Sequence, residues 1–308
     1  MKISEILASE KKPFPSIEIV PPSKGVSKNE LIEMIKPFMA FNPPYVNVTC
    51  HRNEYEYTKA NDGSLIRRTI KNTVSQTAVC AVVQDEFKVE VVPHMICGGA
   101  VEYDIQTDLY DFNFMGVSNI LALRGDSIHG EERFTPETGG FRYASELVSA
   151  IRKFEAEHNG DFCIGVAGYP EKHFEAPDMK TDLMNLKKKV DAGADFIITQ
   201  MFYDNDIFYR FRDLCIESGI RVPIIPGVMP LSSAKQTISF PSIFSLSIPL
   251  ELSEKMKAEK DNPDVCYRIG TDWSCSQCED LLKNGVPAIH FYTMGKQNNI
   301  LDILKSLF

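Results

Sequence analysis

Eight short apolar runs, separated by helical patterns, constrain what this chain of 308 residues can fold into. Four of the runs directly follow a helical pattern that ends in glycine, as in MGVSNILAL (115–123) and DAGADFIIT (191–199). Glycine suits the left-handed C-cap of a helix, and the run behind it is too short to be a helix. Because the runs are apolar on both faces, they predict buried parallel strands. The predicted strands are 16–20, 45–49, 89–96, 119–124, 162–169, 196–202, 222–229 and 288–293.

Eight strands alternating with helices predict an α/β fold of the (β/α)8 TIM-barrel type, for which about 250 residues is typical. A doubly wound open sheet is the alternative, but the chain has no G-x-G-x-x-G turn after its first strand and no Walker loop. We therefore expect one (β/α)8 domain over residues 1–308. The alternation breaks at about 231–270, where we expect a helix followed by an excursion on the barrel rim.

Charge and composition argue against several classes of partner. The 33 Lys and Arg residues against 42 Asp and Glu give a net charge of -9, which repels nucleic acid at long range. No window approaches 18 consecutive apolar residues, so no membrane span is expected. The start of the chain has no apolar core of signal-peptide length, and the 8 cysteines are expected to be reduced thiols. These features predict a cytoplasmic protein.

In a (β/α)8 barrel, chemistry collects at the C-terminal ends of the strands. Glu18 lies within the first predicted strand, where an ionised carboxylate is costly to bury, so burial favours the protonated form that a general acid needs. The alternative is an ion pair with Arg or Lys from a neighbouring strand. Arg124, Gly125 and Asp126 follow the fourth strand, and they combine a planar fork for phosphate with a residue that lets a ligand approach the backbone. The alternative there is an Arg–Asp pair that closes a turn.

The other strand ends carry amides, aromatic rings and scattered cations. Thr49, taken singly, is as compatible with packing as with function, and a lone histidine such as His94 on an apolar run is more often a core residue than a ligand. Together, the strand ends suit a large planar heterocycle with phosphates and a second ring, as in redox chemistry by a bound cofactor. The residues concerned are Thr49, His94, Gly168, Tyr169, Gln200, Gln236, Phe240, His290, Tyr292 and Lys296.

Several other chemistries are not favoured by the sequence. We find no cluster of carboxylates and histidines at metal-ligand spacing, no lysine within a predicted strand for a Schiff base, and no G-x-S-x-G elbow. Cys275 and Cys278 form a C-x-x-C pair with Cys266 upstream, but no second pair completes four ligands. We expect these cysteines to lie within a helix that Thr271 caps.

The chain resembles the methylenetetrahydrofolate reductase family from about residue 14 to its C-terminus. Its length is similar to that of the bacterial type, which has the catalytic barrel without a regulatory extension. The matching segments are EIVPP (18–22), VT (48–49), PH (93–94), LRGD (123–126), YASEL (143–147), AGYPE (167–171), Asp182, NLK (185–187), KVDAGA (189–194), TQ (199–200), IPG (225–227), KQ (235–236) and HFYT (290–293).

This resemblance implies a barrel that holds FAD at its strand ends and reduces 5,10-methylenetetrahydrofolate to 5-methyltetrahydrofolate, with NADH or NADPH as the electron donor. It further implies a ping-pong scheme and a homo-oligomer. The residues that the resemblance assigns to FAD are Thr49, His94, Leu123, Arg124, Gly125, Asp126, Tyr143, Ala167, Tyr169, Asp182, Asn185 and Lys189.

The resemblance also assigns residues to the reacting molecules. Glu18 is expected to protonate the folate N10 and open the methylene bridge, and Asp126 to stabilise the resulting cation. The residues expected to face folate or nicotinamide are Glu18, Asp126, Gln200, Gln236, Phe240 and Lys296. Lys296 stands where the family has an arginine that meets the folate tail, so it keeps the charge without the bidentate fork.

Three alternatives keep the same barrel. One is a flavin-free lyase or aldolase, one is a binding protein without turnover, and one is a flavoprotein that takes electrons from a partner redox protein. A yellow colour that NADH or NADPH bleaches would separate the reductase from all three.

Overall fold

The computed structural model describes residues 1–50, 54–125, 134–293 and 298–308. Its main sheet is entirely parallel, with the strand order β10-β11-β1-β2-β5-β6-β7-β8-β9. The two end strands, β9 and β10, are consecutive segments separated only by Pro226, so the ring closes through this residue. The predicted (β/α)8 barrel is therefore confirmed. The strands are β1 (Phe14–Ile19), β2 (Tyr45–Val48), β5 (Glu90–Ile96), β6 (Asn119–Leu123), β7 (Cys163–Gly168), β8 (Phe196–Thr199), β9 (Ile224–Ile225), β10 (Gly227–Val228) and β11 (Ala288–Phe291).

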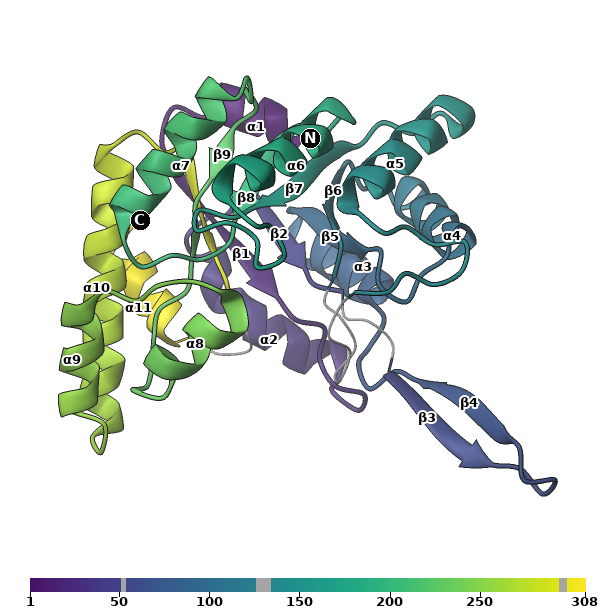
Figure 1. The fold of residues 1–308 in the computed structure, drawn as a ribbon, viewed down its shortest axis with the longest axis horizontal. Coiled ribbons are helices and arrows are strands. Elements are labelled where there is room, and N and C mark those ends of the chain that lie inside the picture. Colours follow the sequence, from purple (N-terminus) through teal and green to yellow (C-terminus); the bar gives the residue numbers. More distant parts are fainter. Residues whose placement is uncertain (51–53, 126–133, 294–297) are drawn as a thin grey trace.

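Helices surround the ring in Figure 1, and they bury one apolar face each against the outward side chains of the strands. In α2, for example, Leu31, Ile35 and Phe38 are buried, and Ser27 with Glu30 forms the capping box that starts the helix. The helices of the barrel wall are α2 (Lys28–Met39), α3 (Gln76–Phe87), α4 (Glu102–Phe114), α5 (Ala144–His158), α6 (Met179–Asp191), α7 (Asn205–Glu217), α10 (Pro263–Lys283) and α11 (Asn298–Leu307).

A short N-terminal helix, α1 (Ile3–Ser9), covers the end of the barrel at which the strands begin. Ile3 and Ile6 join the apolar cluster inside the ring, together with Phe14 at the start of β1. The backbone N–H of Ile3 donates to the side chain of Asn119 at 2.7 Å, at the start of β6. Because this end is sealed by apolar packing, the opposite end is left for polar side chains.

The rim segment after β10 contains two helices, α8 (Gln236–Phe244) and α9 (Leu250–Ala258), before α10 begins. Side chains from these helices pack with residues that follow β8 and β10. Together they form an apolar rim cluster that consists of Met201, Tyr203, Met229, Leu231, Phe240, Leu246, Leu252 and Met256. Gly270 lets α10 approach this segment, because a Cβ at that position would lie 1.8 Å from the carbonyl oxygen of Leu231.

The expected cap at Thr271 is wrong. The α10 helix has its N-cap nine residues earlier, at Asn262, with Pro263 in its first turn. Thr271 lies inside the helix, where its hydroxyl donates to the Tyr267 carbonyl at 2.8 Å. An internal hydroxyl that bonds back to the preceding turn is compatible with an uninterrupted helix.

An antiparallel hairpin that the sequence analysis did not anticipate projects from the barrel between β2 and α3 (Figure 1). Its strands are β3 (Glu54–Lys59) and β4 (Leu65–Ile70), paired from Glu54 with Ile70 to Lys59 with Leu65. The connecting turn is closed by the Ala60 N–H, which donates to the Ser64 carbonyl at 2.8 Å. Because it follows β2, the hairpin starts from the C-terminal face of the barrel.

Candidate active site

Side chains inside the ring change from apolar to polar along the strand direction. On β1, Phe14 belongs to the inner apolar cluster, while Ser16 and Glu18 follow at alternate positions and are buried. On β2, Tyr45 is followed in the same way by Asn47 and then by Thr49 just beyond the strand. The polar layer therefore lies toward the C-terminal ends of the strands, where the sequence predicted the site.

Glu18 is buried at this level, with 8% of its surface exposed. Its Oε2 lies 3.9 Å from Nε2 of His94 and 3.9 Å from Nε2 of His290, from β5 and β11. Its own carbonyl accepts a hydrogen bond from the Thr293 hydroxyl at 2.8 Å. Among the described residues, the ion-pair partners within 4.0 Å of the Glu18 carboxylate are these two imidazoles, not an Arg or Lys from a neighbouring strand.

Ser16 and Asn47 extend this polar layer and were missed by the sequence analysis. The Ser16 hydroxyl is 2.8 Å from Nδ1 of His290. Asn47 stands opposite Glu18 in the β1–β2 register, and both atoms of its buried amide lack a hydrogen-bond partner among the described residues. The signal was present in FPSIEI and YVNVT, where polar residues alternate with apolar ones at the period of a strand.

A second cluster, which we call the cationic cluster, contains Arg124, Lys172, His173 and Lys189. Arg124 follows β6 and forms an ion pair with Glu175, and its guanidinium lies 5.0 Å from the ring centroid of Phe134. His173 Nε2 is 3.5 Å from the same guanidinium. Burial and the nearby Arg124 lower the pKa of His173 to about 4, so its ring is neutral at pH 7.

Lys189 reaches this cluster from α6. Its ammonium donates to the Ala167 carbonyl at 2.5 Å and lies 5.7 Å from the ring centroid of Tyr169. Desolvation lowers the pKa of Lys189 to about 8, against the raising influence of Asp182. Burial in turn raises the pKa of Asp182, and Lys189 and Lys172 oppose that shift. The cluster thus holds more positive than negative charge in a poorly solvated place, which is the arrangement expected of an anion site.

The remaining residues predicted to bind a cofactor lie on the elements around this cluster. Leu123 ends β6, and Gly125 follows with φ of 81°, in the left-handed region that favours glycine. Tyr143 is the N-cap of α5 and is half exposed, and Asn185 lies on the exposed part of α6. Thr49 and His94 belong to the buried polar layer around Glu18.

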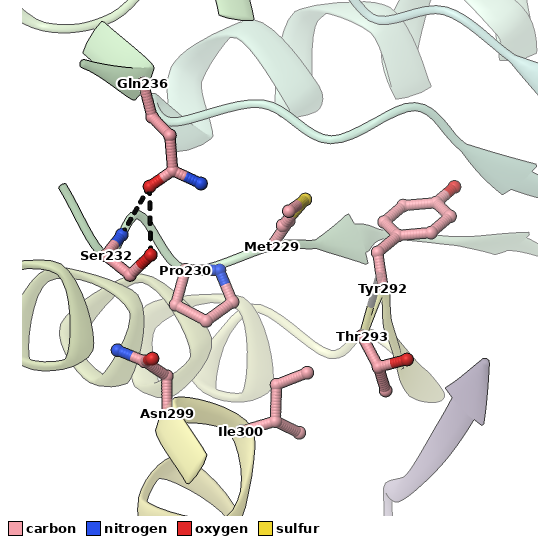
Figure 2. Close-up of a pocket in the computed structure, with 8 residues that line it drawn as sticks. All are labelled: Met229, Pro230, Ser232, Gln236, Tyr292, Thr293, Asn299 and Ile300. Atoms are coloured by element: carbon pink, nitrogen blue, oxygen red, sulfur yellow. Dashed lines mark hydrogen bonds between the residues drawn. The ribbon is translucent and has the colours of Figure 1, made fainter. Parts of the chain in front are cut away.

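The residues predicted to bind substrate come from β8, which pairs with β7, and from the rim segment after β10. The side-chain oxygen of Gln200, after β8, accepts from the Met201 N–H at 3.0 Å. Gln236 lines a small pocket with Met229 and Tyr292, and Figure 2 shows its side-chain oxygen turned toward Ser232. That oxygen accepts from the Ser232 N–H at 2.6 Å. Phe240 is buried in the rim cluster and meets Phe244 edge-on.

Two predicted site residues, Asp126 and Lys296, lie outside the described residues. Within the part of the chain that the structure describes, no group of three or more His, Cys, Asp or Glu side chains could hold a metal ion. Cys275 and Cys278 are free thiols on α10, and burial raises the pKa of both. Of the described helices, none combines the length and apolar character needed to cross a membrane.

Comparison with known proteins identifies the family. The family model for methylenetetrahydrofolate reductase matches residues 2–308. The chain belongs to the methylenetetrahydrofolate reductase family. The resemblance seen in the sequence is therefore confirmed.

Relatives in this family differ in length. A 5,10-methylenetetrahydrofolate reductase of Escherichia coli is 33% identical over 281 residues, which are 91% of this chain and 86% of the relative. Methylenetetrahydrofolate reductase (NADH) 1 of Arabidopsis thaliana is also 33% identical, over 95% of this chain but 48% of its own length. The chain thus spans about half the length of the plant relative and most of the bacterial one.

A solved structure shares the fold. It is an uncharacterized protein from Clostridium thermocellum, described as binding two copies of 5-methyl-5,6,7,8-tetrahydrofolic acid. The TM-score is 0.59 at 13% sequence identity, and the match covers 99% of this chain and 97% of that one. At this identity the likeness supports the barrel alone.

Proposed function

We propose that this chain reduces 5,10-methylenetetrahydrofolate to 5-methyltetrahydrofolate with electrons from NADH or NADPH, using bound FAD. The observation that carries the proposal is the buried Glu18 carboxyl between two imidazoles at the mouth of a barrel of this family. The relative from Escherichia coli, which is of similar length, bears the name of this activity.

The described residues fit a dinucleotide of the size and charge of FAD. Arg124 and the buried Lys189 supply positive charge for a diphosphate, and the proximity of Arg124 contributes to the lowered pKa of Lys189, which a bound anion would oppose. The buried Asn47 amide, opposite Glu18 in the β1–β2 register, offers a donor and an acceptor that no described residue uses. The described residues thus offer both positive charge for phosphates and hydrogen-bonding groups for a ring.

We assign FAD to the residues that the family resemblance implies. Arg124 and Lys189 hold the phosphates, with Asp182 keeping Lys189 in place, and Tyr169 and Tyr143 offer rings at the mouth. Thr49, His94, Leu123, Gly125, Ala167 and Asn185 complete this set, together with Asp126. When bound, FAD supplies two-electron chemistry, accepting hydride from the nicotinamide and passing it to the folate.

Glu18 acts as the general acid on folate. The methylene bridge must open to a 5-iminium cation before it can accept hydride, and opening requires a proton on N10. Glu18 is buried in the polar layer inside the barrel, so its carboxyl can meet N10 of a folate bound at the mouth. Each turnover uses the proton, and the imidazoles of His94 and His290, each 3.9 Å from the carboxylate, are placed to replace it.

The other substrate residues orient the pterin and stabilise charge. Asp126 is placed by sequence directly after β6, and we propose that it stabilises the iminium cation electrostatically. Gln200 and Gln236 offer amides to the pterin, Phe240 offers a ring, and Lys296 offers a charge to the folate tail. NAD(P)H and folate occupy the same place in turn, which gives a ping-pong scheme.

We further propose that the protein works in a reducing cytoplasm as a homo-oligomer with a role in methionine biosynthesis. The eight cysteines support the first part, because all are free thiols and most are buried.

The test of the activity is an anaerobic absorption spectrum of the purified protein. We expect a flavin spectrum that bleaches with NADH or NADPH and returns when methylenetetrahydrofolate is added. A colourless protein that FAD does not bind would overturn the proposal and favour a lyase. A yellow protein that neither nicotinamide bleaches would point instead to a partner redox protein as the donor.

A further inference from the structure

Helix α8, which carries Gln236 and Phe240 of the proposed substrate site, has little internal stability. It is nine residues long, and an isolated helix of that length is marginal in water. Pro241 lies inside it and has no backbone N–H to donate to the preceding turn. The residues that α8 buries are Thr237 and Phe240. The position of this helix therefore depends on contacts made at its two ends.

The N-terminal end of α8 is held by its own first residue. The side-chain oxygen of Gln236 accepts hydrogen bonds from the backbone N–H of Ser232 at 2.6 Å and of Ser233 at 3.0 Å. Figure 2 shows the first of these contacts. They tie the start of the helix to the turn that follows β10.

The C-terminal end of α8 is held from another part of the barrel, by Glu171. The helix ends at Ser245, where φ of 53° turns the chain out of the helical path. Leu246 and Ile248 then pack on the rim cluster, while Ser247, between them, contacts Glu171. The Ser247 N–H lies 2.9 Å from each oxygen of the Glu171 carboxylate, and the Ser247 hydroxyl donates to one of them at 2.5 Å. Both donor groups of Ser247 are thus satisfied by one carboxylate.

Glu171 belongs to the loop after β7, which also carries residues of the proposed flavin site. It lies two residues after Tyr169, whose carbonyl accepts from the Lys172 N–H at 3.0 Å. Lys172 has φ of 66°, in the left-handed region where a non-glycine residue is uncommon. The Tyr169 ring meets the His173 ring edge-on, with their centroids 4.8 Å apart. This tight turn fixes the direction of Glu171 relative to Tyr169.

The contact between Glu171 and Ser247 joins segments that follow two different strands. In the sheet, β8 pairs with β7 on one side and with β9 on the other, and β9 continues through Pro226 into β10. The contact therefore runs from the loop after β7 to the rim segment after β10. Gln200, which follows β8, lies between the two in strand order.

We propose that Glu171 is a positioning residue of the reductase site. By holding Ser247 it fixes α8 against the loop that lines the flavin site, and so sets where NAD(P)H and folate lie relative to the flavin. The inference rests on the proposed function and adds to it a residue that acts through α8. The effect of Glu171 should therefore fall on both substrates and not on FAD.

The first test is hydrogen–deuterium exchange of the full-length protein, followed by mass spectrometry. In Glu171→Ala we expect peptides that cover 236–249 to exchange about tenfold faster, because α8 loses its second anchor, and peptides that cover 250–258 to be unchanged. Glu251→Ala removes an exposed carboxylate from α9 of the same rim segment and should leave the exchange of 236–249 unchanged. Unchanged exchange of 236–249 in Glu171→Ala would overturn the proposal, and so would equal acceleration of all peptides, which indicates general destabilisation.

The second test measures binding and the two half-reactions by anaerobic stopped-flow absorbance. In Glu171→Ala we expect the apparent dissociation constants of the nicotinamide donor and of methylenetetrahydrofolate to rise by a similar factor, about three- to tenfold, with that of FAD within about twofold of wild type. Glu171→Gln keeps an acceptor oxygen for Ser247 and should recover most of the lost affinity. A loss of FAD affinity as large as the loss of substrate affinity would overturn the proposal. A change confined to one substrate would do the same.

The two tests separate this inference from the proposed function. Exchange needs no turnover, so a protein that shows the expected exchange but reduces no folate would contradict the proposed function. A reductase in which Glu171→Ala leaves the exchange of α8 unchanged would contradict the role of Glu171 alone.

Discussion

The Oε2 atom of Glu18 lies 3.9 Å from Nε2 of His290, while Nδ1 of the same ring is 2.8 Å from the Ser16 hydroxyl. The ring is thus fixed on one side and faces the buried carboxyl on the other. His94 approaches the same carboxylate oxygen at 3.9 Å from β5. A carboxyl with imidazoles as its nearest titratable neighbours can be resupplied with protons, which a general acid requires at every turnover.

Replacing Glu18 with glutamine should separate the two half-reactions. The amide keeps the shape of the side chain but cannot donate the proton that opens the methylene bridge. We expect flavin reduction by NADH to stay within about threefold of wild type, and reoxidation by methylenetetrahydrofolate to slow by about 10²–10⁴-fold. Anaerobic stopped-flow absorbance measures both rates.

The matched control for this variant is Glu90→Gln. Glu90 is also a strand glutamate, but it is only partly buried and begins β5 at the sealed end of the barrel, beside the N-terminal amino group. The rates of both half-reactions should be unchanged in Glu90→Gln. Equal losses of the two rates in Glu18→Gln would contradict the assignment of Glu18 as an acid.

Asn47→Leu should stabilise the FAD-free protein and weaken the binding of FAD or folate. Both atoms of the buried Asn47 amide lack a partner among the described residues, and an unsatisfied buried polar group costs about 1–3 kcal/mol. Leucine of similar size removes that cost, so we expect the FAD-free protein to unfold at a higher urea concentration. FAD or folate binding should weaken at the same time. A variant less stable than wild type would show that Asn47 is a structural residue.

The barrel could be predicted because each of its strands is marked by a pattern within a few consecutive residues. Each predicted strand needed only a short apolar run, and Glu18 stood out because one carboxylate interrupts such a run. The partners of Glu18 were harder to predict, because Ser16 and His290 meet only through the closure of β1 onto β11. The distance between Ser16 and His290 along the chain gives no indication that they pair.

The hairpin of β3 and β4 could not be predicted for a different physical reason. Its strands are held by cross-strand pairing and not by a core, so they carry charges and aromatic residues in place of an apolar run. The Asp62-Gly63 turn signal was present, but it had no apolar strands on either side. The α10 cap was misplaced because Thr271 resembles an N-cap residue, while the true start depends on Pro263 and on packing against the rim segment.

Arg124→Ala should weaken retention of FAD. Arg124 follows β6 at the barrel mouth and is near enough to Lys189 to lower its pKa, so a diphosphate would receive charge from both. We expect the dissociation constant for FAD to rise at least tenfold, measured by flavin fluorescence on dilution. Arg212→Ala, at a partly exposed arginine on α7, is the control. Unchanged FAD content after dilution would remove Arg124 from the phosphate site.

The pKa of Lys189 predicts how FAD affinity and stability vary with pH. Desolvation lowers the pKa of Lys189 from 10.5 to about 8 in the FAD-free protein. Above that pH the ammonium loses its proton, so FAD affinity should fall as pH rises from 8 to 10. Lys189→Met should bind FAD weakly and show a much smaller change over the same range. A wild-type affinity that is constant from pH 7 to 10 would contradict a phosphate contact at Lys189.

The free energy of unfolding of the FAD-free protein should rise with pH over the range in which FAD affinity falls. Because the unfolded chain keeps the Lys189 proton up to about pH 10.5, it binds more protons than the folded state between 8 and 10.5. The contribution of Lys189 to the free energy of unfolding is therefore unfavourable below pH 8 and is relieved as the pH rises. Lys189→Met should raise that free energy at pH 7 by up to about 3 kcal/mol, less what is lost with the hydrogen bond to Ala167. Urea unfolding at pH 7 and pH 10 measures this difference, and a variant that is destabilised equally at both values would show that the ammonium is not strained by burial.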